Sequence, residues 1–403
     1  MSTFGSALRA ARVSRGLSLR AMSRLVNWDF GYLGQIERGA REPTAKLAAA
    51  CDKALDAGGR LIAAYERQTG EADMQRRTVL RALSVTAVGI GRPVVALEAL
   101  RHGLSATVDN HVDEWNRLVA DYGYDYYTTP ADDLMAQATA DLAVLQAVIA
   151  ADATDRQVEL LRVAARLSVI VALGLVASGQ PHLARRWWST ADQLADQSDD
   201  PDTQVLTRAW ATVNGCYDGR PLAQAIAVSD KALPLAGSRP TAATCGLLAG
   251  RAQALALAGR HAEATTTVEQ LAEVTERLPD TVVGEVESLW GWPEHRLRHT
   301  ESYVYTYTGA LTKAEAAQDR ALELYPRSHV RLRTQVQLHR ASCLIQGGHV
   351  SDGLRYAADL IDALPAEHHN EVLYSVARQV TTVVPSTEQR QPLFGELTAR
   401  VGG

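Results

Sequence analysis

Two histidines, His295 and His299, have the spacing at which side chains on one face of a helix can hold a metal ion. They stand four residues apart in WPEHRLRHTE. In zinc proteases that use such a pair, a catalytic Glu directly follows the first His, whereas Arg296 occupies that position here. We therefore predict no metal site, and we interpret the two histidines as a surface pair flanked by arginines.

The sequence contains none of the short patterns that carry common catalytic chemistry. It has no GxxxxGK[ST] phosphate loop, no GxSxG nucleophile turn and no Gly-rich dinucleotide loop. The four cysteines are scattered, with no CxxC pair, which indicates neither a zinc site nor a disulfide framework. We expect no enzyme activity and no cofactor.

The clearest local pattern is SLRAMSRLVNWDFGYLGQIERG, residues 18–39. Ser18 and Asp29 can each cap a helix. Between them, Asn27 tolerates the positive φ of a tight turn, and Gly39 can end the second helix. The expected apolar faces are Leu19, Met22, Leu25 and Val26 in the first helix, Leu33 and Ile36 in the second, and Leu8, Val13, Leu47 and Leu55 in flanking helices. The pattern predicts two helices joined by a sharp turn within a small bundle.

This segment, continued through AREP, resembles the helix-turn-helix of phage repressors and Cro proteins, the XRE family, over residues 4–67. The resemblance implies a five-helix-type DNA-binding domain over residues 1–67, with an Arg12–Glu37 pair between its helices. It implies DNA contacts by Ser18, Phe30, Gly31, Tyr32, Gln35, Arg38 and Arg41. Because Phe30 and Gly31 replace polar base-reading residues, the resemblance favours contact with a thymine methyl or recognition of DNA shape.

Charge is divided unevenly along the 403 residues. Residues 1–67 hold 11 Lys and Arg against 6 Asp and Glu, a net charge of +5, and the remainder has a net charge of −10. A basic N-terminal region on an acidic body is typical of a DNA-binding module carried by a sensing or assembly domain. We predict double-stranded operator DNA as a partner.

Residues 76–91, RRTVLRALSVTAVGIG, combine paired arginines with a short apolar run, as a twin-arginine export signal does. A folded domain precedes them, and the run is too short to span a bilayer. We interpret them as an amphipathic linker helix that packs on the body. We expect a cytoplasmic protein with no membrane partner.

Beyond residue 130, helical segments alternate with glycine breaks at Gly179, Gly219, Gly259, Gly309 and Gly348. A small residue follows each break at nearly constant spacing: Ala184, Ala225, Ala264, Ala314 and Gly353. Small residues let the second helix of a unit approach the first closely. The units resemble tetratricopeptide repeats and predict an all-α solenoid over residues 131–403. We also interpret the segment SYVYTYTG as a helix. Residues 68–130 are assigned to a helical linker, which resembles the joining region of actinobacterial helix-turn-helix regulators.

A solenoid has a concave face, lined by the first helix of each pair, that binds peptides or small ligands. The candidate ligand residues are Asn214, Trp210, Arg251, Trp292 and Arg298. Asn214 is the best candidate by resemblance to peptide-sensing regulators of the Rgg type, whereas any one Trp can instead be a core residue. We predict a sequence-specific transcriptional regulator whose body forms a homodimer and senses a peptide or small molecule. The alternative is a scaffold whose repeats bind a partner protein, with no small ligand.

Overall fold

The computed structural model describes residues 4–39, 41, 43–67, 111–151 and 156–402. Every regular element in these ranges is a helix, in agreement with the predicted all-α class. The chain divides into two compact units, residues 1–92 and 93–403. We call the described residues of the first unit the head and those of the second the body. The linker helix predicted over residues 76–91 lies outside the described residues.

The head is a small helical bundle. Its helices are α1 (Phe4–Ser14), α2 (Leu19–Val26), α3 (Phe30–Glu37) and α4 (Ala45–Ala54), followed by helical residues 60–67. The core contains most of the predicted apolar residues: Leu8, Met22, Val26, Leu33, Ile36, Leu47 and Leu55. The prediction is wrong for Val13 and Leu25, which are each 58% exposed. Leu25 lies about 100° around α2 from Val26, beyond the edge of the stripe that a short helix buries.

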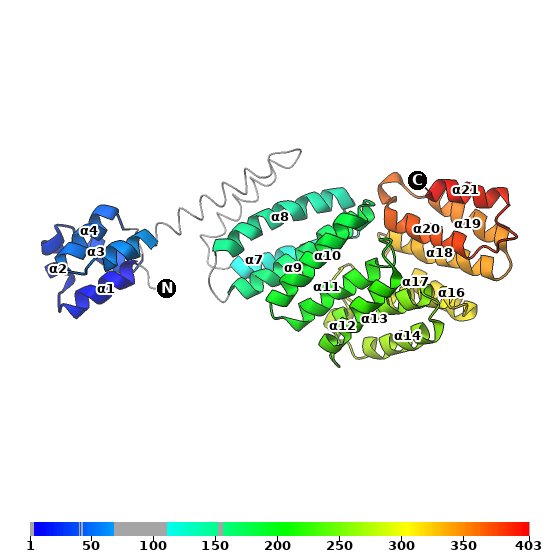
Figure 1. Cartoon of the computed structure of the whole chain (residues 1–403), viewed down its shortest axis with the longest axis horizontal. Helices are drawn as coiled ribbons and strands as arrows, with labels where there is room; N and C mark the ends of the chain where they lie inside the picture. Colours follow the sequence, from blue (N-terminus) through cyan, green and yellow to red (C-terminus); the bar gives the residue numbers. More distant parts are fainter. Residues whose placement is uncertain (1–3, 40, 42, 68–110, 152–155, 403) are drawn as a thin grey trace. The chain divides into compact units, whose positions relative to one another are not determined.

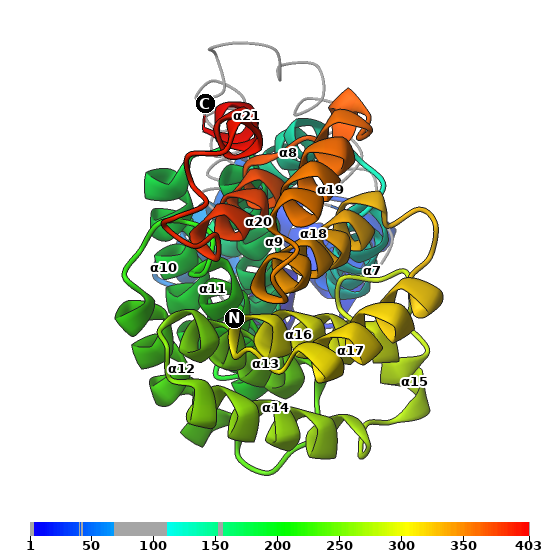
Figure 2. The ribbon, with the colours of Figure 1, turned by 90° about the vertical axis from the view of Figure 1, so that its right-hand side faces the viewer.

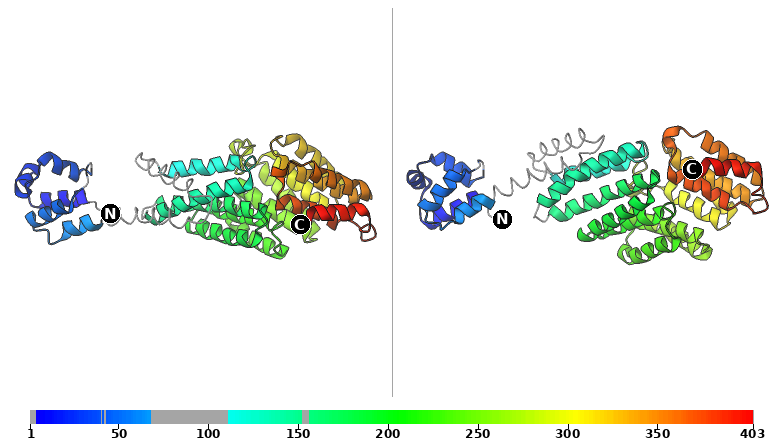
Figure 3. Two further views of the ribbon diagram at one scale, coloured as in Figure 1. Left: turned by 90° about the horizontal axis from the view of Figure 1, so that it is seen from above. Right: turned by 45° about the horizontal axis from the view of Figure 1, so that its top comes forward.

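The body consists of helices arranged mainly as antiparallel pairs (Figures 1 and 3). Its elements are α7 (His111–Asp125), α8 (Ala131–Ala151), α9 (Arg156–Ala177), α10 (Pro181–Gln197), α11 (Pro201–Asn214), α12 (Leu222–Ala236), α13 (Ala242–Leu257), α14 (His261–Thr275), α15 (Asp280–Val283), α16 (Glu294–Tyr307), α17 (Leu311–Leu324), α18 (Val330–Gln346), α19 (Val350–Asp362), η1 (Ala366–His368), α20 (Glu371–Thr382) and α21 (Pro392–Val401). The predicted helix at SYVYTYTG is confirmed up to Tyr307, where α16 ends, and its last two residues form the turn that follows.

The predicted repeat breaks are confirmed. Each lies between the two helices of a pair and has a φ between 69° and 90°, a region that favours glycine: Gly179, Gly219, Gly259, Gly309 and Gly348. The small residues that follow are packed as expected. Those that carry a Cβ are fully buried: Ala184, Ala225, Ala264 and Ala314. At Gly353, an added Cβ would lie 2.6 Å from Ile345 Cγ1, so the close approach of α19 to α18 requires glycine there.

The helix α7 belongs to the body, although we predicted residues 68–130 as a linker. Trp115, Val119 and Tyr122 are buried in one core cluster with residues of α9. Their spacing places them on one face of α7, and this face packs as a repeat helix does. The packing of the body therefore includes α7, N-terminal to the predicted boundary at residue 131.

The apolar character of α9 is explained by its position in the core. Residues 131–150 of α8 and residues 156–177 of α9 are long and apolar enough to cross a membrane. However, 78% of the α9 stretch is buried in the body, where it contacts α7, α8, α10 and α20. A core helix covered on several sides has no polar face, so its composition matches that of a membrane span.

The helix pairs curve around an interior. Seen along the body (Figure 2), the first helices of the pairs lie inside and the second helices lie outside. Near the C-terminus, α20 packs against both α18 and α9, so a late helix of the body contacts an early inner helix. The inner helices thereby surround a common space.

Candidate DNA-binding surface and ligand cavity

The turn between α2 and α3 has the predicted caps. Ser18 Oγ accepts a hydrogen bond from the backbone N–H of Ala21 at 3.2 Å, and Asp29 Oδ1 accepts one from Tyr32 at 2.9 Å. Asn27 ends α2 with a φ of 58°. Because these bonds satisfy first-turn amides that have no partner within their helices, they fix where α2 and α3 begin.

The predicted pair between Arg12 and Glu37 is confirmed. Arg12 Nε donates to Glu37 Oε1 at 2.6 Å, and Nη2 donates to Oε2 at 2.7 Å. The third nitrogen, Nη1, donates to the carbonyl of Leu17 at 2.6 Å. The side chains are only 11% and 6% exposed, and their hydrogen bonds raise the pKa of Arg12. This two-pronged pair ties α1 to the end of α3.

The candidate DNA residues form a largely accessible set on the head. Five are exposed and two, Gly31 and Tyr32, are half-buried; the exposed ones are Ser18, Phe30, Gln35, Arg38 and Arg41. Phe30 is 47% exposed, which is unusual for a large apolar side chain. At Gly31, a Cβ would lie 3.0 Å from Asp29 Oδ1, so glycine leaves room for the cap of α3.

Two arginines lie over aromatic rings of this surface. The Cζ of Arg41 is 4.9 Å from the ring centroid of Tyr32, and the Cζ of Arg20 is 5.5 Å from that of Phe30. Arg20 was not among the predicted residues. It lies in the first turn of α2, at the opposite end of that helix from the turn into α3, so no local pattern indicates it.

In the body, the inner helices line a partly open cavity of about 160 Å³. Its walls are mainly aromatic and apolar. The aromatic and polar residues include Tyr126, Tyr127, Trp210, Asn214, Gln253, Trp290, Trp292, Arg296, His299 and Tyr325. They come from the α7–α8 connection, from α11, α13, α16 and from the segments before α16 and α18, so residues far apart in sequence meet here.

Three of the five predicted ligand residues line this cavity: Trp210, Asn214 and Trp292. Asn214 Nδ2 donates to the carbonyl of Trp210 at 2.9 Å within α11. The other two predicted residues, Arg251 and Arg298, are not part of the lining.

Both arginines are engaged with side chains outside the cavity lining. Arg251 Nη1 donates to Ser229 Oγ at 2.9 Å and pairs with Asp230. Arg298 pairs with Glu294 and Glu301 on its own helix. Arg298 lies about 200° around α16 from Arg296, so only one of the two can face the cavity.

Arg296 is a charged lining residue that we had not predicted as a ligand residue. Its Nη1 donates to the carbonyl of Gly291 at 2.7 Å, and its Nη2 donates to Tyr127 Oη at 2.5 Å. Its Cζ lies 5.4 Å from the ring centroid of Trp210 and 5.6 Å from that of Trp292. Hydrogen bonds and cation–π contacts together hold the guanidinium at the cavity wall.

The interpretation of His295 and His299 as a surface pair is wrong, because both are buried. The ring of His295 lies 4.3 Å from that of Tyr325, and Tyr325 Oη lies 3.0 Å from His299 Nδ1. Burial, and then the charge of Arg296, lower the pKa of His295 to about 3 and that of His299 to about 4. Both rings are neutral at physiological pH.

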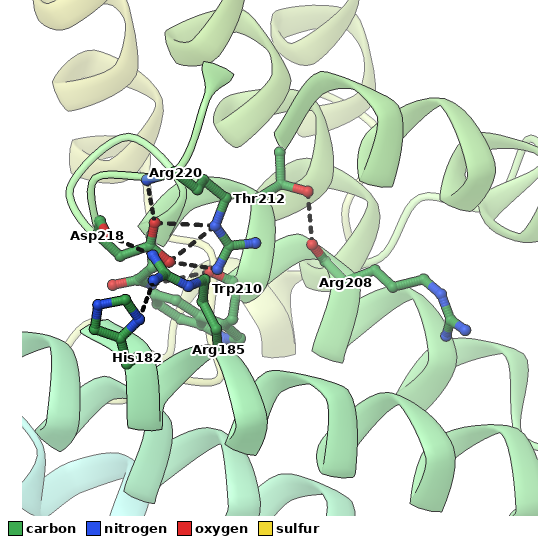
Figure 4. A network of polar contacts seen from close by, with 8 residues as sticks. His182, Arg185, Arg208, Trp210, Thr212, Asp218 and Arg220 are labelled. Carbon is green, nitrogen blue, oxygen red and sulfur yellow. Dashed lines mark hydrogen bonds and ion pairs between the residues drawn. The ribbon is translucent and has the colours of Figure 1, made fainter. Parts of the chain in front are cut away.

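A polar network holds the C-terminal end of α11, which carries Trp210 and Asn214 (Figure 4). The buried Asp218 carboxylate pairs with Arg220, whose Nε donates to it at 2.9 and 3.0 Å. Arg185 of α10 donates to the Asp218 carbonyl at 3.1 Å. These bonds connect α10 to the turn after α11, and so they limit movement of one cavity wall.

Comparison with known proteins gives matches for the head and for most of the chain. Residues 3–65 match the family described as "Helix-turn-helix domain". The transcriptional regulator ClgR of Mycobacterium tuberculosis, from strains CDC 1551 / Oshkosh and ATCC 25618 / H37Rv, is 40% identical over 76 residues, which cover 18% of this chain and 68% of ClgR. Among solved structures, Bacillus thuringiensis PlcR in complex with the peptide PapR7 and DNA aligns over 90% of this chain and 95% of that chain, with 11% identity and a TM-score of 0.32.

Proposed function

The chain belongs to the XRE-type helix-turn-helix transcriptional regulators, and on that premise we propose that it is a cytoplasmic, homodimeric regulator whose body senses a peptide or small molecule. Binding to DNA and regulation of transcription are the activities of this family. The proposal adds the DNA-contact residues, the dimer, the cytoplasmic location and the ligand. The four free cysteines support a reducing compartment.

For the DNA contact, we propose that Gln35 reads a base and that Arg38 and Arg41 bind phosphates. All three side chains are exposed on the head, and this part of the chain has a net charge of +5. Phe30, also exposed, offers an apolar surface for a thymine methyl. Ser18 and the half-buried Gly31 and Tyr32 complete the proposed contact surface.

The observation that carries the sensing proposal is the cavity within the body. Protein interiors are close-packed, so a space of about 160 Å³ lined by aromatic and polar side chains is a candidate ligand site. A scaffold that only binds a partner protein needs a broad exposed contact surface and gains little from so small a cavity. The cavity therefore favours sensing over the scaffold alternative.

The dimer follows from the small size of the head. A single helix-turn-helix module buries little DNA surface, whereas two modules reach half-sites about 34–36 Å apart on one face of the duplex. Repeat domains have uncovered terminal faces through which two bodies can associate.

The test uses the full chain with an operator selected from random duplex DNA. We expect two chains per operator by sedimentation, and a small molecule or peptide released when the purified protein is denatured. Trp210→Ala should reduce the amount of ligand that co-purifies. Trp187→Ala, a half-buried tryptophan outside the cavity lining, is the matched control and should not. A monomer that binds one half-site tightly would contradict the dimer. A stoichiometric protein partner with no released ligand would favour the scaffold.

A further inference from the structure

The described lining of the cavity carries charge of only one sign. Arg296 is the only charged side chain among the described lining residues, which include no carboxylate. The neighbouring His299 is neutral, because burial and Arg296 itself lower its pKa to about 4. The described wall of the cavity thus carries one positive charge with no anion facing it.

The guanidinium of Arg296 has unused hydrogen-bonding capacity. It carries five N–H groups, of which one donates to Gly291 and one to Tyr127. The remaining three have no partner among the described residues. Trp210 and Trp292 lie against the cation, but an aromatic ring stabilises it without accepting these N–H bonds in the plane of the guanidinium.

Two other arginines of the inner helices, Arg298 and Arg251, differ from Arg296 in this respect. Arg298, two positions further along α16, pairs with Glu294 and Glu301. Arg251 of α13 pairs with Asp230. Because an unpaired, half-buried cation is costly, Arg296 favours an anion in the cavity that it lines.

The tryptophans Trp290 and Trp292 offer a ligand in the cavity their ring faces but no free indole N–H group. The indole N–H of Trp290 donates to the Val119 carbonyl at 2.7 Å, and that of Trp292 donates to Thr275 Oγ1 at 3.1 Å. Both indoles are therefore satisfied by the protein and offer only apolar surface to a ligand. An apolar cavity of about 150 Å³ accepts benzene, so the space of about 160 Å³ suits a ligand part of one aromatic ring.

We infer that the cavity binds a carboxylate attached to a small aromatic or apolar group, with Arg296 as the residue that binds the carboxylate. The carboxylate accepts two N–H bonds from the guanidinium, and the apolar group lies against Trp290 and Trp292. This inference rests on the proposed sensing function and names its ligand class. Two sources share this chemistry: a free aromatic acid, and the C-terminal carboxylate of a short apolar peptide.

The experiment measures binding to the full chain by titration calorimetry, with phenylacetate and its neutral analogue phenylacetamide as probes. We expect wild-type protein to bind the acid about tenfold or more tightly than the amide. Arg296→Met should abolish this preference, and Arg296→Lys should keep part of it. Arg298→Met removes a cation from the same helix but outside the cavity, and it should retain the full preference. A second pair, acetyl-Ala-Leu-Phe with a free or an amidated C-terminus, distinguishes the two sources.

Three outcomes would overturn the inference. The first is equal affinity of wild-type protein for the acid and the amide. The second is an undiminished preference for the acid in Arg296→Met or Arg296→Lys protein that melts as the wild type does. The third is no binding of either acid at about 10 mM. In each case the sensing proposal is judged separately by the ligand that co-purifies with wild-type protein. A neutral co-purified ligand would refute only the carboxylate, whereas the absence of any ligand would refute sensing itself.

Discussion

Replacement of Glu37 by Ala tests whether its pair with Arg12 holds the head together. The two side chains share two bonds of 2.6 and 2.7 Å and are only 11% and 6% exposed. Removing one partner of a buried pair typically costs about 3–5 kcal/mol, because it leaves the other charge buried and alone. Arg12 keeps its bond to the Leu17 carbonyl, which hinders its escape to solvent. We therefore expect a loss of about 3 kcal/mol.

This loss is large for a domain of this size. A single core of fewer than 70–80 residues rarely supplies more than about 3–5 kcal/mol, so Glu37→Ala should leave an isolated head of residues 1–67 with no more than about 2 kcal/mol of stability at 25 °C. The measurement is urea unfolding of this fragment, followed by circular dichroism. Ligands and DNA are absent, so the result reports the pair alone.

Two further variants separate the ion pair from general sensitivity of the head. Arg12→Met combined with Glu37→Met removes both charges and should restore most of the stability, since a buried pair is often replaceable by apolar residues. Arg15→Ala breaks the exposed 3.5 Å pair with Asp56 and should cost less than about 1 kcal/mol. The reasoning fails if Glu37→Ala costs no more than Arg15→Ala, or if the double variant is less stable than Glu37→Ala.

Four other perturbations have definite expected results. Gln35→Ala should cost about 1–3 kcal/mol on the operator and relax discrimination at one base pair, whereas Arg38→Ala should weaken binding to all DNA and flatten the salt dependence, both measured by fluorescence anisotropy. The pKa values of about 3 for His295 and about 4 for His299 in the folded state lie below the unfolded value of about 6.5, so the unfolded chain binds more protons below pH 6.5. Each histidine should therefore lower the free energy of unfolding by about 2 kcal/mol between pH 7 and pH 5, measured by urea unfolding, and equal stability at the two pH values would contradict the burial of these rings. Gly353→Ala places a Cβ 2.6 Å from a side chain of α18 and should lower stability by about 1–3 kcal/mol in the same assay.

The head could be predicted in detail because its rules act over a few residues. The caps at Ser18 and Asp29 and the positive φ of Asn27 each depend on residues within one turn of helix. The Arg12–Glu37 pair came instead from the resemblance, since nothing local joins positions 25 residues apart. The errors, Val13 and Leu25, lie at the edges of apolar stripes, where the coverage by neighbouring helices decides exposure.

The repeat breaks of the body were also predictable, because a turn with a positive φ favours glycine, and glycine is identified directly in the sequence. The beginning of the body was not predictable. Trp115 of α7 is fully buried against α9, but no glycine break or small residue at repeat spacing marks α7 as part of the series. Burial of this helix depends on a contact with residues more than forty positions away, which a local pattern does not contain.

The residues that line the cavity could not be identified from sequence periodicity. A surface helix reveals its orientation through one apolar and one polar face, whereas α16 is buried on several sides and carries polar residues all round. Arg296 and Arg298 are therefore equivalent in the sequence, and only packing turns the first to the cavity and the second to Glu294 and Glu301. The same packing buries His295 and His299. An inner helix packs against outer helices on one side and lines the cavity on the other. It therefore carries polar groups inside the body, and it lacks the single apolar stripe that would have identified its orientation.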